Sequence, residues 1–419
     1  MRGVKEVIVT SDSTGENYSA AVWDPTTASL LSTYKHASAL GFHTLQLLGD
    51  SYLLAADAMK PSLHLWPLNS QNTVPNLHLS TPAKVTALAS TPNGSYLAAG
   101  LKEKISVWQV CTGRLLATLA EHFQTVTCLV FNSDGTVFAS GGEDGLIFLW
   151  SLAQVATGQT SPMQSFTVHS RAIKDLYFGK FGLKGRLCSV SADCTAKIFD
   201  ACIGKVLLNV PCDAPLLSVT MDIIESRLFL GTANGKIIQI NLHDPPRSIE
   251  RFASTDQDNE KSVINAHDGG VVTLSVSVDC KTLVSGGTDG MVHIWDIPAR
   301  EIIKTIKHKG PIVSAFFAKS LDNFRTRTLK PSVNVRPLQR TSDDSSQNAH
   351  IHVALKDDNI TTLLNPDLYF SNQTAIASSS ENDSEKLKTA LKEIENLKSV
   401  NAALYQYSVK NLLSKASIE

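Results

Sequence analysis

The chain has 419 residues, of which 43% are apolar and 18% are charged, and its formal net charge is −1. This composition can bury a large core, argues against a globally basic nucleic-acid binder, and contains neither a signal-peptide core nor a membrane-spanning apolar run. The seven cysteines are scattered singly without a CxxC pair, which is typical of reduced thiols in an intracellular protein.

A short apolar segment that ends in tryptophan recurs along the chain. All five tryptophans close such a segment, at Trp23, Trp66, Trp108, Trp150 and Trp295. AKIF, which ends at Phe199, and KIIQI, which contains Gln239, take the same place between the last two. The successive gaps of 43, 42, 42, 49, 40 and 56 residues match the period of the WD40 propeller unit, which has four strands per blade. We therefore predict an all-β fold, a seven-bladed WD40 β-propeller.

Turn signals separate the strand-like segments inside each unit. In the fourth unit, VTCLVF and VFASGG are separated by Asp134-Gly135, and Asp144-Gly145 leads into LIFLW. Asp-Gly between alternating segments indicates a hairpin, because a type I′ turn needs positive φ angles. Each unit is therefore expected to be a small antiparallel sheet.

A histidine, a serine and an aspartate, together with the closing aromatic residue, recur at similar offsets in three units. They are His122, Ser140, Asp144 and Trp150 in the fourth unit, His169, Ser189, Asp193 and Phe199 in the fifth, and His267, Ser285, Asp289 and Trp295 in the seventh. Such a trio could serve a hydrolase, but an active site would not be repeated along one chain. A hydrogen-bonded relay would be, because each blade must satisfy its partly buried polar groups. The pattern resembles the structural tetrad of the WD40 family, so no catalytic residue is expected.

Three units depart from this pattern. The second and third carry Lys60 and Lys102 at the position of the tetrad aspartate, and the sixth carries Gln239 at the position of the tryptophan. A lost tetrad costs local stability, and it either reflects sequence drift or frees a surface for a partner.

The two ends of the propeller are expected to meet in one blade. KEVIVTSD at the N-terminus has a second-strand pattern but lacks an inner strand, and PIVSAFFA has an inner-strand pattern without a following tryptophan. A ring left open there would expose strand edges. We therefore predict that Ile312 to Ala318 pairs with Val4 to Thr10 and that the propeller spans residues 1–319.

Residues 320–383 are expected to form a basic strap followed by a polar, flexible linker. The segment from Lys319 to Arg340 contains six Lys or Arg and one acidic residue. We favour an extended strap that runs along the ring or into a partner protein, while direct contact with RNA phosphates stays open. The candidate contact residues are Arg325, Arg327, Lys330 and Arg336.

Residues 384–415 are predicted to form a C-terminal α-helix of coiled-coil type, because apolar residues fall on heptad positions. The residues expected to dock against a partner helix are Leu387, Leu391, Ile394, Leu397, Asn401 and Leu404. About three heptads make such a helix marginal in isolation, so it needs a partner. The alternative is a helix that folds back onto its own propeller.

The seven units, the sixth blade with Gln239 in the tryptophan place, TPNGSYLAAG, the basic strap and the helix with ENLKSVNAALY occur together. In this combination the chain resembles the WD repeat-containing protein 18 family. The resemblance implies a non-enzymatic scaffold in the nucleolar complex for late 60S pre-ribosome maturation. The residues themselves show no ligand spacing, so no cofactor and no metal are expected.

The same resemblance implies the partners and the location of the protein. The partners would be a large proline-, glutamate- and leucine-rich helical-repeat scaffold, a second, testis-expressed-protein-like helical-repeat subunit, the AAA ATPase midasin and the pre-60S particle. The roles would be removal of internal transcribed spacer 2 and docking of midasin, with a link to DNA replication licensing and paired copies in the complex. The location would be the nucleolus and nucleoplasm, with a cytoplasmic pool left open.

Two other functions remain as alternatives. A WD40 substrate receptor of a cullin ubiquitin ligase often carries Trp-Asp-x-Arg after the third strand, whereas Trp295-Asp296 is followed by Ile297-Pro298 and the nearby arginine, Arg300, is two positions late. A direct RNA-binding propeller would use the basic strap. An enzyme ranks third, because no phosphate loop, zinc spacing or unrepeated nucleophile constellation stands out.

Overall fold

The structure is a computed structural model that describes residues 6–37, 39–242, 250, 263–341 and 399. The chain divides into two compact units, Met1–Ala354 and Leu355–Glu419. Within the described residues, all strands belong to the first unit and no helix is long and apolar enough to cross a membrane.

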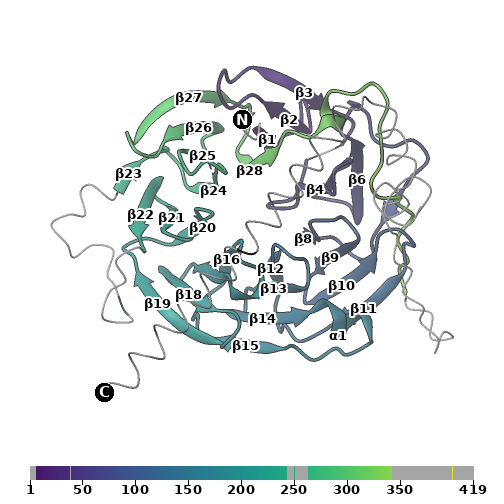
Figure 1. The fold of residues 1–419 in the computed structure, drawn as a ribbon, viewed down its shortest axis with the longest axis horizontal. Coiled ribbons are helices and arrows are strands. Elements are labelled where there is room, and N and C mark those ends of the chain that lie inside the picture. Colours follow the sequence, from purple (N-terminus) through teal and green to yellow (C-terminus); the bar gives the residue numbers. More distant parts are fainter. Residues whose placement is uncertain (1–5, 38, 243–249, 251–262, 342–398, 400–419) are drawn as a thin grey trace. The chain divides into compact units, whose positions relative to one another are not determined.

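The first unit is a ring of seven four-stranded antiparallel sheets within the described residues (Figure 1). The first blade consists of β28 (Ile312–Lys319), β1 (Glu6–Asp12), β2 (Ala20–Trp23) and β3 (Leu30–Tyr34). The second contains β4 (Gln46–Leu48), β5 (Tyr52–Ala56), β6 (Ser62–Pro67) and β7 (Leu79–Ser80). The third contains β8 (Ala87–Ser90), β9 (Tyr96–Leu101), β10 (Lys104–Gln109) and β11 (Leu115–Leu119).

The remaining four blades follow in chain order. The fourth contains β12 (Val126–Phe131), β13 (Val137–Gly142), β14 (Leu146–Ser151) and β15 (Gln164–Thr167), with the short helix α1 (Leu152–Ala156) before its last strand. The fifth contains β16 (Ile173–Phe178), β17 (Arg186–Ser191), β18 (Thr195–Asp200) and β19 (Lys205–Pro211). The sixth contains β20 (Leu216–Met221), β21 (Arg227–Thr232), β22 (Lys236–Asn241) and β23 (Val263–Asn265). The seventh contains β24 (Val271–Val276), β25 (Thr282–Gly287), β26 (Met291–Asp296) and β27 (Glu301–Lys307).

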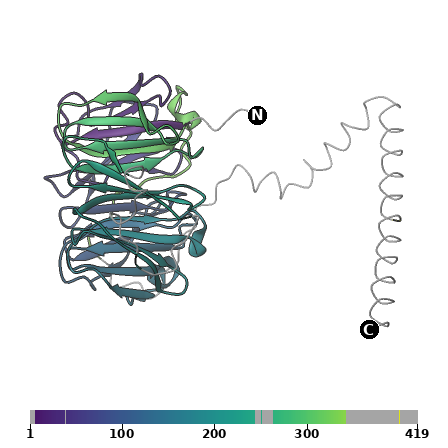
Figure 2. The same ribbon diagram turned by 90° about the vertical axis from the view of Figure 1, so that its left-hand side faces the viewer.

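The innermost strand of each blade faces the centre of the ring, and Figure 2 shows the ring from its edge. The ring closes as predicted, because β28 pairs with β1 from Glu6 opposite Lys319 to Asp12 opposite Ile312. The chain enters the first blade at its second strand and returns, after the other six blades, to supply the inner strand. This shared blade removes the strand edges that an open ring would expose.

The seven recurring segments all lie on the third strand of their blades, so the predicted phase is confirmed. Most apolar side chains of these strands are buried because the sheets of neighbouring blades pack against them. In β14, for example, Trp150 is fully buried in an apolar cluster with Val107 of β10 and Phe138 of β13. Burying a side chain such as Phe138 stabilises the fold by roughly 1.5–3 kcal/mol.

The hairpin turns form where predicted, but their type differs from the prediction. Gly135 and Gly145 have φ angles of 70° and 75°, whereas Asp134 and Asp144 do not have positive φ. A type I′ turn requires positive φ at both central residues, so the expectation of this type was wrong. In the turn before β14, the Asp144 side chain instead accepts a 3.0 Å hydrogen bond from the Leu146 amide.

The strap segment extends the compact unit past Lys319, where the propeller was expected to end. After β28 come the 3-10 helix η3 (Asp322–Phe324) and an irregular chain that follows the second and third blades (light green in Figure 1). Val333 and Leu338 of this segment are buried in the same apolar cluster as Trp108. Another 3-10 helix, η1 (Gly182–Lys184), lies between β16 and β17.

Candidate functional site

The fourth blade contains a continuous chain of hydrogen bonds from a turn to the tryptophan. His122 Nδ1 lies 3.0 Å from Asp144 Oδ2, and His122 Nε2 lies 2.9 Å from Ser140 Oγ. The Trp150 indole N–H donates to the same Ser140 oxygen at 3.0 Å. His122 stands before the inner strand, Ser140 on the second and Asp144 in the turn to the third, so the relay ties these parts of the blade together.

The seventh blade repeats this relay. His267 Nδ1 lies 3.0 Å from Asp289 Oδ2, His267 Nε2 lies 2.8 Å from Ser285 Oγ, and the Trp295 indole N–H donates to Ser285 Oγ at 2.9 Å. The Asp289 carboxylate also accepts the backbone N–H of Met291, which shapes the turn into β26.

The fifth blade has the relay without its indole donor. His169 Nδ1 lies 3.0 Å from Asp193 Oδ2, and His169 Nε2 lies 2.7 Å from Ser189 Oγ. Phe199 occupies the tryptophan position and has no N–H to donate. Thr195 Oγ1 donates a 2.6 Å hydrogen bond to Asp193. Burial alone would raise the pKa of Asp193, but hydrogen bonds from His169 and Thr195 hold that pKa well below its usual range.

Burial makes these trios unsuitable for nucleophilic catalysis. Ser140, Ser189 and Ser285 are fully buried, and each hydroxyl is already bonded to its histidine. A catalytic serine must present its oxygen to a substrate carbonyl next to oxyanion donors. Burial lowers the pKa of His122, although Asp144 acts in the opposite direction. The lowered pKa favours the neutral imidazole in the relay.

The first blade holds a fourth, looser version that the sequence analysis missed. The Trp23 indole N–H donates to Thr10 Oγ1 at 2.7 Å. His308, which precedes β28, lies with its Nδ1 3.9 Å from Asp12 Oδ2. The signal was present in the sequence, since His308 stands just before an inner strand as His122 does. It was obscured because these residues come from the two ends of the ring.

The second blade has a turn carboxylate that the sequence analysis did not identify. Lys60 was aligned with the tetrad aspartate, but the turn is organised by Asp57 instead. Asp57 Oδ1 accepts the backbone N–H groups of Met59 and Lys60, and its Oδ2 lies 3.2 Å from His64 Nε2. The Trp66 indole bonds outside this group, to the Lys35 carbonyl oxygen at 2.8 Å.

The strap supplies the hydrogen-bond acceptor for the tryptophan of the third blade. The Trp108 indole N–H donates to the backbone carbonyl of Gln339 at 2.8 Å, and the Gln339 amide donates to the Gly113 carbonyl at 2.8 Å. Further along the ring, the Ser332 amide donates to Ser51 Oγ at 2.6 Å. The strap is therefore fixed to the second and third blades by backbone hydrogen bonds and by its buried apolar side chains.

The candidate contact residues of the strap face solvent. Arg325, Arg327, Lys330 and Arg336 are all exposed, as is Arg340 at the end of the segment. The strap thus holds its backbone against the ring while it displays positive charge. Both sequence-based interpretations, a strap along the ring and direct contact with RNA phosphates, are compatible with this arrangement.

A cavity of about 700 Å³ lies among loops and inner strands contributed by all seven blades. Its lining includes Phe42, Lys84, Glu143, Lys174 and Val272. Phe42 is 54% exposed. Its lining thus combines apolar side chains with charged groups of both signs.

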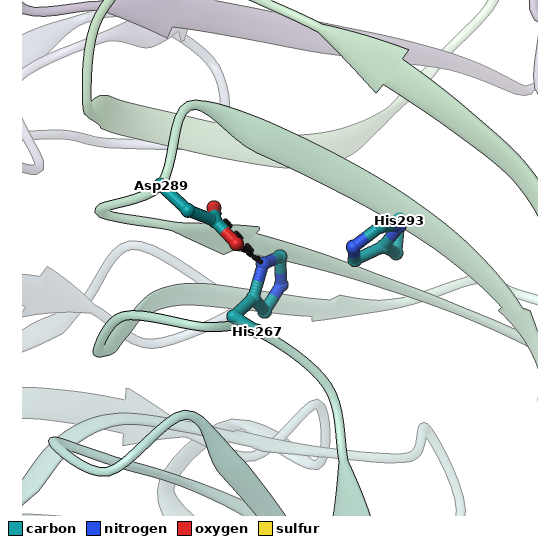
Figure 3. A group of neighbouring side chains, drawn as sticks. All are labelled: His267, Asp289 and His293. Carbon is teal, nitrogen blue, oxygen red and sulfur yellow. Dashed lines mark hydrogen bonds and ion pairs between the residues drawn. The ribbon is translucent and has the colours of Figure 1, made fainter.

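One cluster in the seventh blade has the donors for a metal ion, where the sequence analysis expected none. His267, Asp289 and His293 each offer a donor atom, and these atoms lie within 4.8 Å of one another (Figure 3). His293 was not singled out because His267, which completes the cluster, comes from another segment of the chain, before β24.

The predicted docking helix cannot be compared with the structure. The docking residues Leu387, Leu391, Ile394, Leu397, Asn401 and Leu404 lie outside the described residues. Ser399, which is described, is helical and exposed. The C-terminal helix therefore stays a prediction.

Comparisons with known proteins agree with the architecture. Residues 113–151 and 258–296 match the family model "WD domain, G-beta repeat". Among solved structures, the chain is similar to the crystal structure of the computationally designed Ika8 protein. The TM-score is 0.54 and the identity 21%, over 73% of this chain and 85% of the other. At this identity the likeness supports the fold alone.

Relatives of known name match over most of the chain. The pre-rRNA-processing protein crb3/ipi3 of Schizosaccharomyces pombe is 25% identical over 91% of each chain. The human WD repeat-containing protein 18 is 35% identical over 80% of this chain and 77% of its own. The zebrafish (Danio rerio) WD repeat-containing protein 18 is 31% identical over 98% of both chains. Because this match covers nearly the whole of both chains and the seven blades agree with it, the chain belongs to the WD repeat-containing protein 18 family.

Proposed function

We propose that this chain is a non-enzymatic scaffold subunit in pre-rRNA processing and 60S ribosomal subunit biogenesis. The observation that carries the proposal is family membership along the whole chain, joined by relatives named for pre-rRNA processing. The recurring His–Ser–Asp groups support the proposal as structural parts of the blades, since their hydroxyls are buried. A closed ring with a lined central cavity and a basic strap suits holding several proteins together.

The finer parts of the proposal follow from the family resemblance. The partners would be the large proline-, glutamate- and leucine-rich helical-repeat scaffold, the testis-expressed-protein-like subunit, midasin and the pre-60S particle, with paired copies in the assembly. The work would be removal of internal transcribed spacer 2 and docking of midasin, in the nucleolus and nucleoplasm. A role in DNA replication licensing belongs to the same proposal.

Depletion and rescue test the processing role. Cells that lose the protein are expected to accumulate precursor rRNA that retains internal transcribed spacer 2, detected by hybridisation with a spacer probe. The full chain should restore processing, and a chain that ends before Ser384 should not, because the predicted docking helix is missing. Normal precursor levels after complete depletion would contradict the proposal.

The strap supports a second candidate function, direct contact with RNA. Its four candidate residues are exposed and carry positive charge on a backbone fixed by the ring, so no ordering of the chain is needed on binding. Phosphate contacts by such side chains release counterions, and the resulting affinity falls steeply with salt. A salt-titrated binding assay on the purified protein therefore separates this function from purely protein-mediated scaffolding.

A further inference from the structure

The seventh blade carries two imidazoles where the other complete relays carry one. The His267 and His293 ring centroids lie 4.6 Å apart with an interplanar angle of 36°. The Asp289 carboxylate faces one side of the His267 ring, and the His293 ring lies on the other side of His267 (Figure 3). One donor atom from each residue lies within 4.8 Å of the others.

Among the three blades with a His–Ser–Asp relay, the seventh alone carries a second histidine beside the relay; the second blade, which lacks the relay, has His64 at the same position next to Asp57. The position two residues before the closing aromatic residue is His293 in the seventh blade, Phe148 in the fourth and Lys197 in the fifth. In the fourth blade the Phe148 ring packs edge-on against His122 at 4.7 Å, so the same space is filled by an apolar side chain that cannot bind a metal. The relay alone therefore does not need a histidine at this position.

The surroundings orient both rings as they do in metal sites, where ligating histidines are held by a second hydrogen bond. His267 Nε2 is 2.8 Å from Ser285 Oγ, which leaves Nδ1 facing the carboxylate. His293 Nδ1 is 2.9 Å from Thr305 Oγ1 on the neighbouring strand β27. The Asp289 side chain is 16% exposed, so the cluster is sheltered but reachable from solvent.

We propose that His267, Asp289 and His293 form a binding site for a divalent transition metal ion, with Zn²⁺ as the best match. Two imidazoles and one carboxylate are ligands that zinc prefers, and three protein ligands leave a position for water. Zinc would take the place of the proton shared by His267 and Asp289. His267 then carries its proton on Nε2 and donates it to Ser285 Oγ, so the indole relay stays connected. The metal pins the loop before β24 to the turn that starts β26.

The test is zinc binding to the purified full chain, stripped with a chelator and titrated in competition with a chromogenic zinc indicator. The wild-type chain should bind one more equivalent than the His293→Gln variant. His293→Gln keeps the relay, and its side chain lies at a partly exposed position, so this variant should fold. Because His78 is exposed and lies in the second blade, His78→Gln serves as the matched control and should bind as much zinc as wild type.

Two further readouts separate this site from the free cysteines. Cobalt bound by nitrogen and oxygen donors should give visible d–d bands without the near-ultraviolet thiolate charge-transfer band. Zinc should raise the melting temperature of wild type and of His78→Gln but not of His293→Gln. Equal zinc stoichiometry in wild type and His293→Gln, or a cobalt spectrum that is the same in both, would overturn the proposal.

Discussion

The indole N–H of Trp108 donates a 2.8 Å hydrogen bond to the backbone carbonyl of Gln339, which lies 231 residues later in the chain. The third blade has no His–Ser–Asp relay to accept this N–H. Leaving a buried donor unsatisfied costs about 1–3 kcal/mol, so the strap replaces the missing relay energetically. The strap is therefore part of the propeller, and a degenerate blade need not be a weak one.

Gly113 provides a direct test of the strap contact. Its φ angle is 73°, and a Cβ at this position would overlap the Pro337 carbonyl oxygen of the strap. Gly113→Ala should lower the free energy of unfolding through backbone strain, about 1–2 kcal/mol, and through displacement of the strap, about 1–3 kcal/mol. Denaturant titration measures the sum, and limited proteolysis should show faster cleavage within residues 320–341.

Gly158→Ala is the matched control for this prediction. Gly158 has a φ angle of 89°, but nothing lies within 4 Å of its virtual Cβ, so only the backbone strain applies. Equal destabilisation by the two alanines, with no change in proteolysis, would mean that the strap does not press on Gly113.

The relay predicts a large effect for a small change at Ser140. Ser140→Ala removes the partner of both His122 Nε2 and the Trp150 indole N–H inside the fourth blade. We expect the free energy of unfolding to fall by about 1–3 kcal/mol, because two buried polar groups lose their hydrogen bond. Ser165→Ala, on the exposed side of β15, should change it by no more than about 0.5 kcal/mol. Similar values for the two variants in equilibrium denaturation would argue against a structural relay.

The ring architecture was predictable because a short apolar segment ending in tryptophan recurs at a regular spacing, which is a local, repeated signal. Each closing residue must lie between two neighbouring sheets, so even Phe199 and Gln239 keep the spacing. The parts that escaped prediction depend on contacts between distant segments. His308 reaches the first blade only because the ring closes, and Gln339 reaches Trp108 only because the strap turns back. His308 stands before an inner strand as His122 does, but its partners lie at the other end of the chain, so the offsets within one unit could not identify them. Nothing in the strap sequence indicates Trp108 as a partner.

Acid is expected to destabilise the propeller through its buried histidines. Burial lowers the pKa of His122 and of His308, against the opposing influence of Asp144 and Asp12 respectively. Near pH 6.5 and below, the unfolded chain therefore binds protons at these rings that the folded chain does not bind. The free energy of unfolding should fall as pH drops from about 7.5 to about 5.5, by at most about 1.4 kcal/mol per pH unit for each ring.

Replacing one buried imidazole isolates its contribution to the pH dependence of the unfolding free energy. His308→Gln should reduce the slope of the unfolding free energy against pH over the same range. Above about pH 7.5 the variant and wild-type curves should run parallel, because imidazole is neutral in both states there. A slope that is unchanged by the substitution would show that His308 is not kept neutral by the fold.

The strap makes a quantitative prediction about RNA. If the candidate residues Arg325, Arg327, Lys330 and Arg336 each contact a phosphate, the logarithm of the affinity for single-stranded RNA should fall with the logarithm of salt concentration. The expected slope is about −2.8, from four contacts at about 0.7 each. Replacing all four by glutamine should abolish this slope. The matched control replaces four exposed lysines elsewhere on the ring, Lys205, Lys236, Lys281 and Lys304. Equal slopes for both sets would assign the strap to protein contacts.

The predicted C-terminal helix gives the most direct test of scaffolding. Deletion of residues 384–419 should leave the melting temperature of the ring unchanged but abolish co-purification with the helical-repeat partner. Leu397→Glu should do the same, because it puts a charge on the apolar heptad seam that a partner helix must cover. Lys392→Glu changes charge on the opposite face of the same helix and should retain the partner. Loss of the partner with Lys392→Glu alone, or its retention after the deletion, would mean that docking does not use this seam. A fall in melting temperature after the deletion would instead indicate a helix that packs on its own propeller.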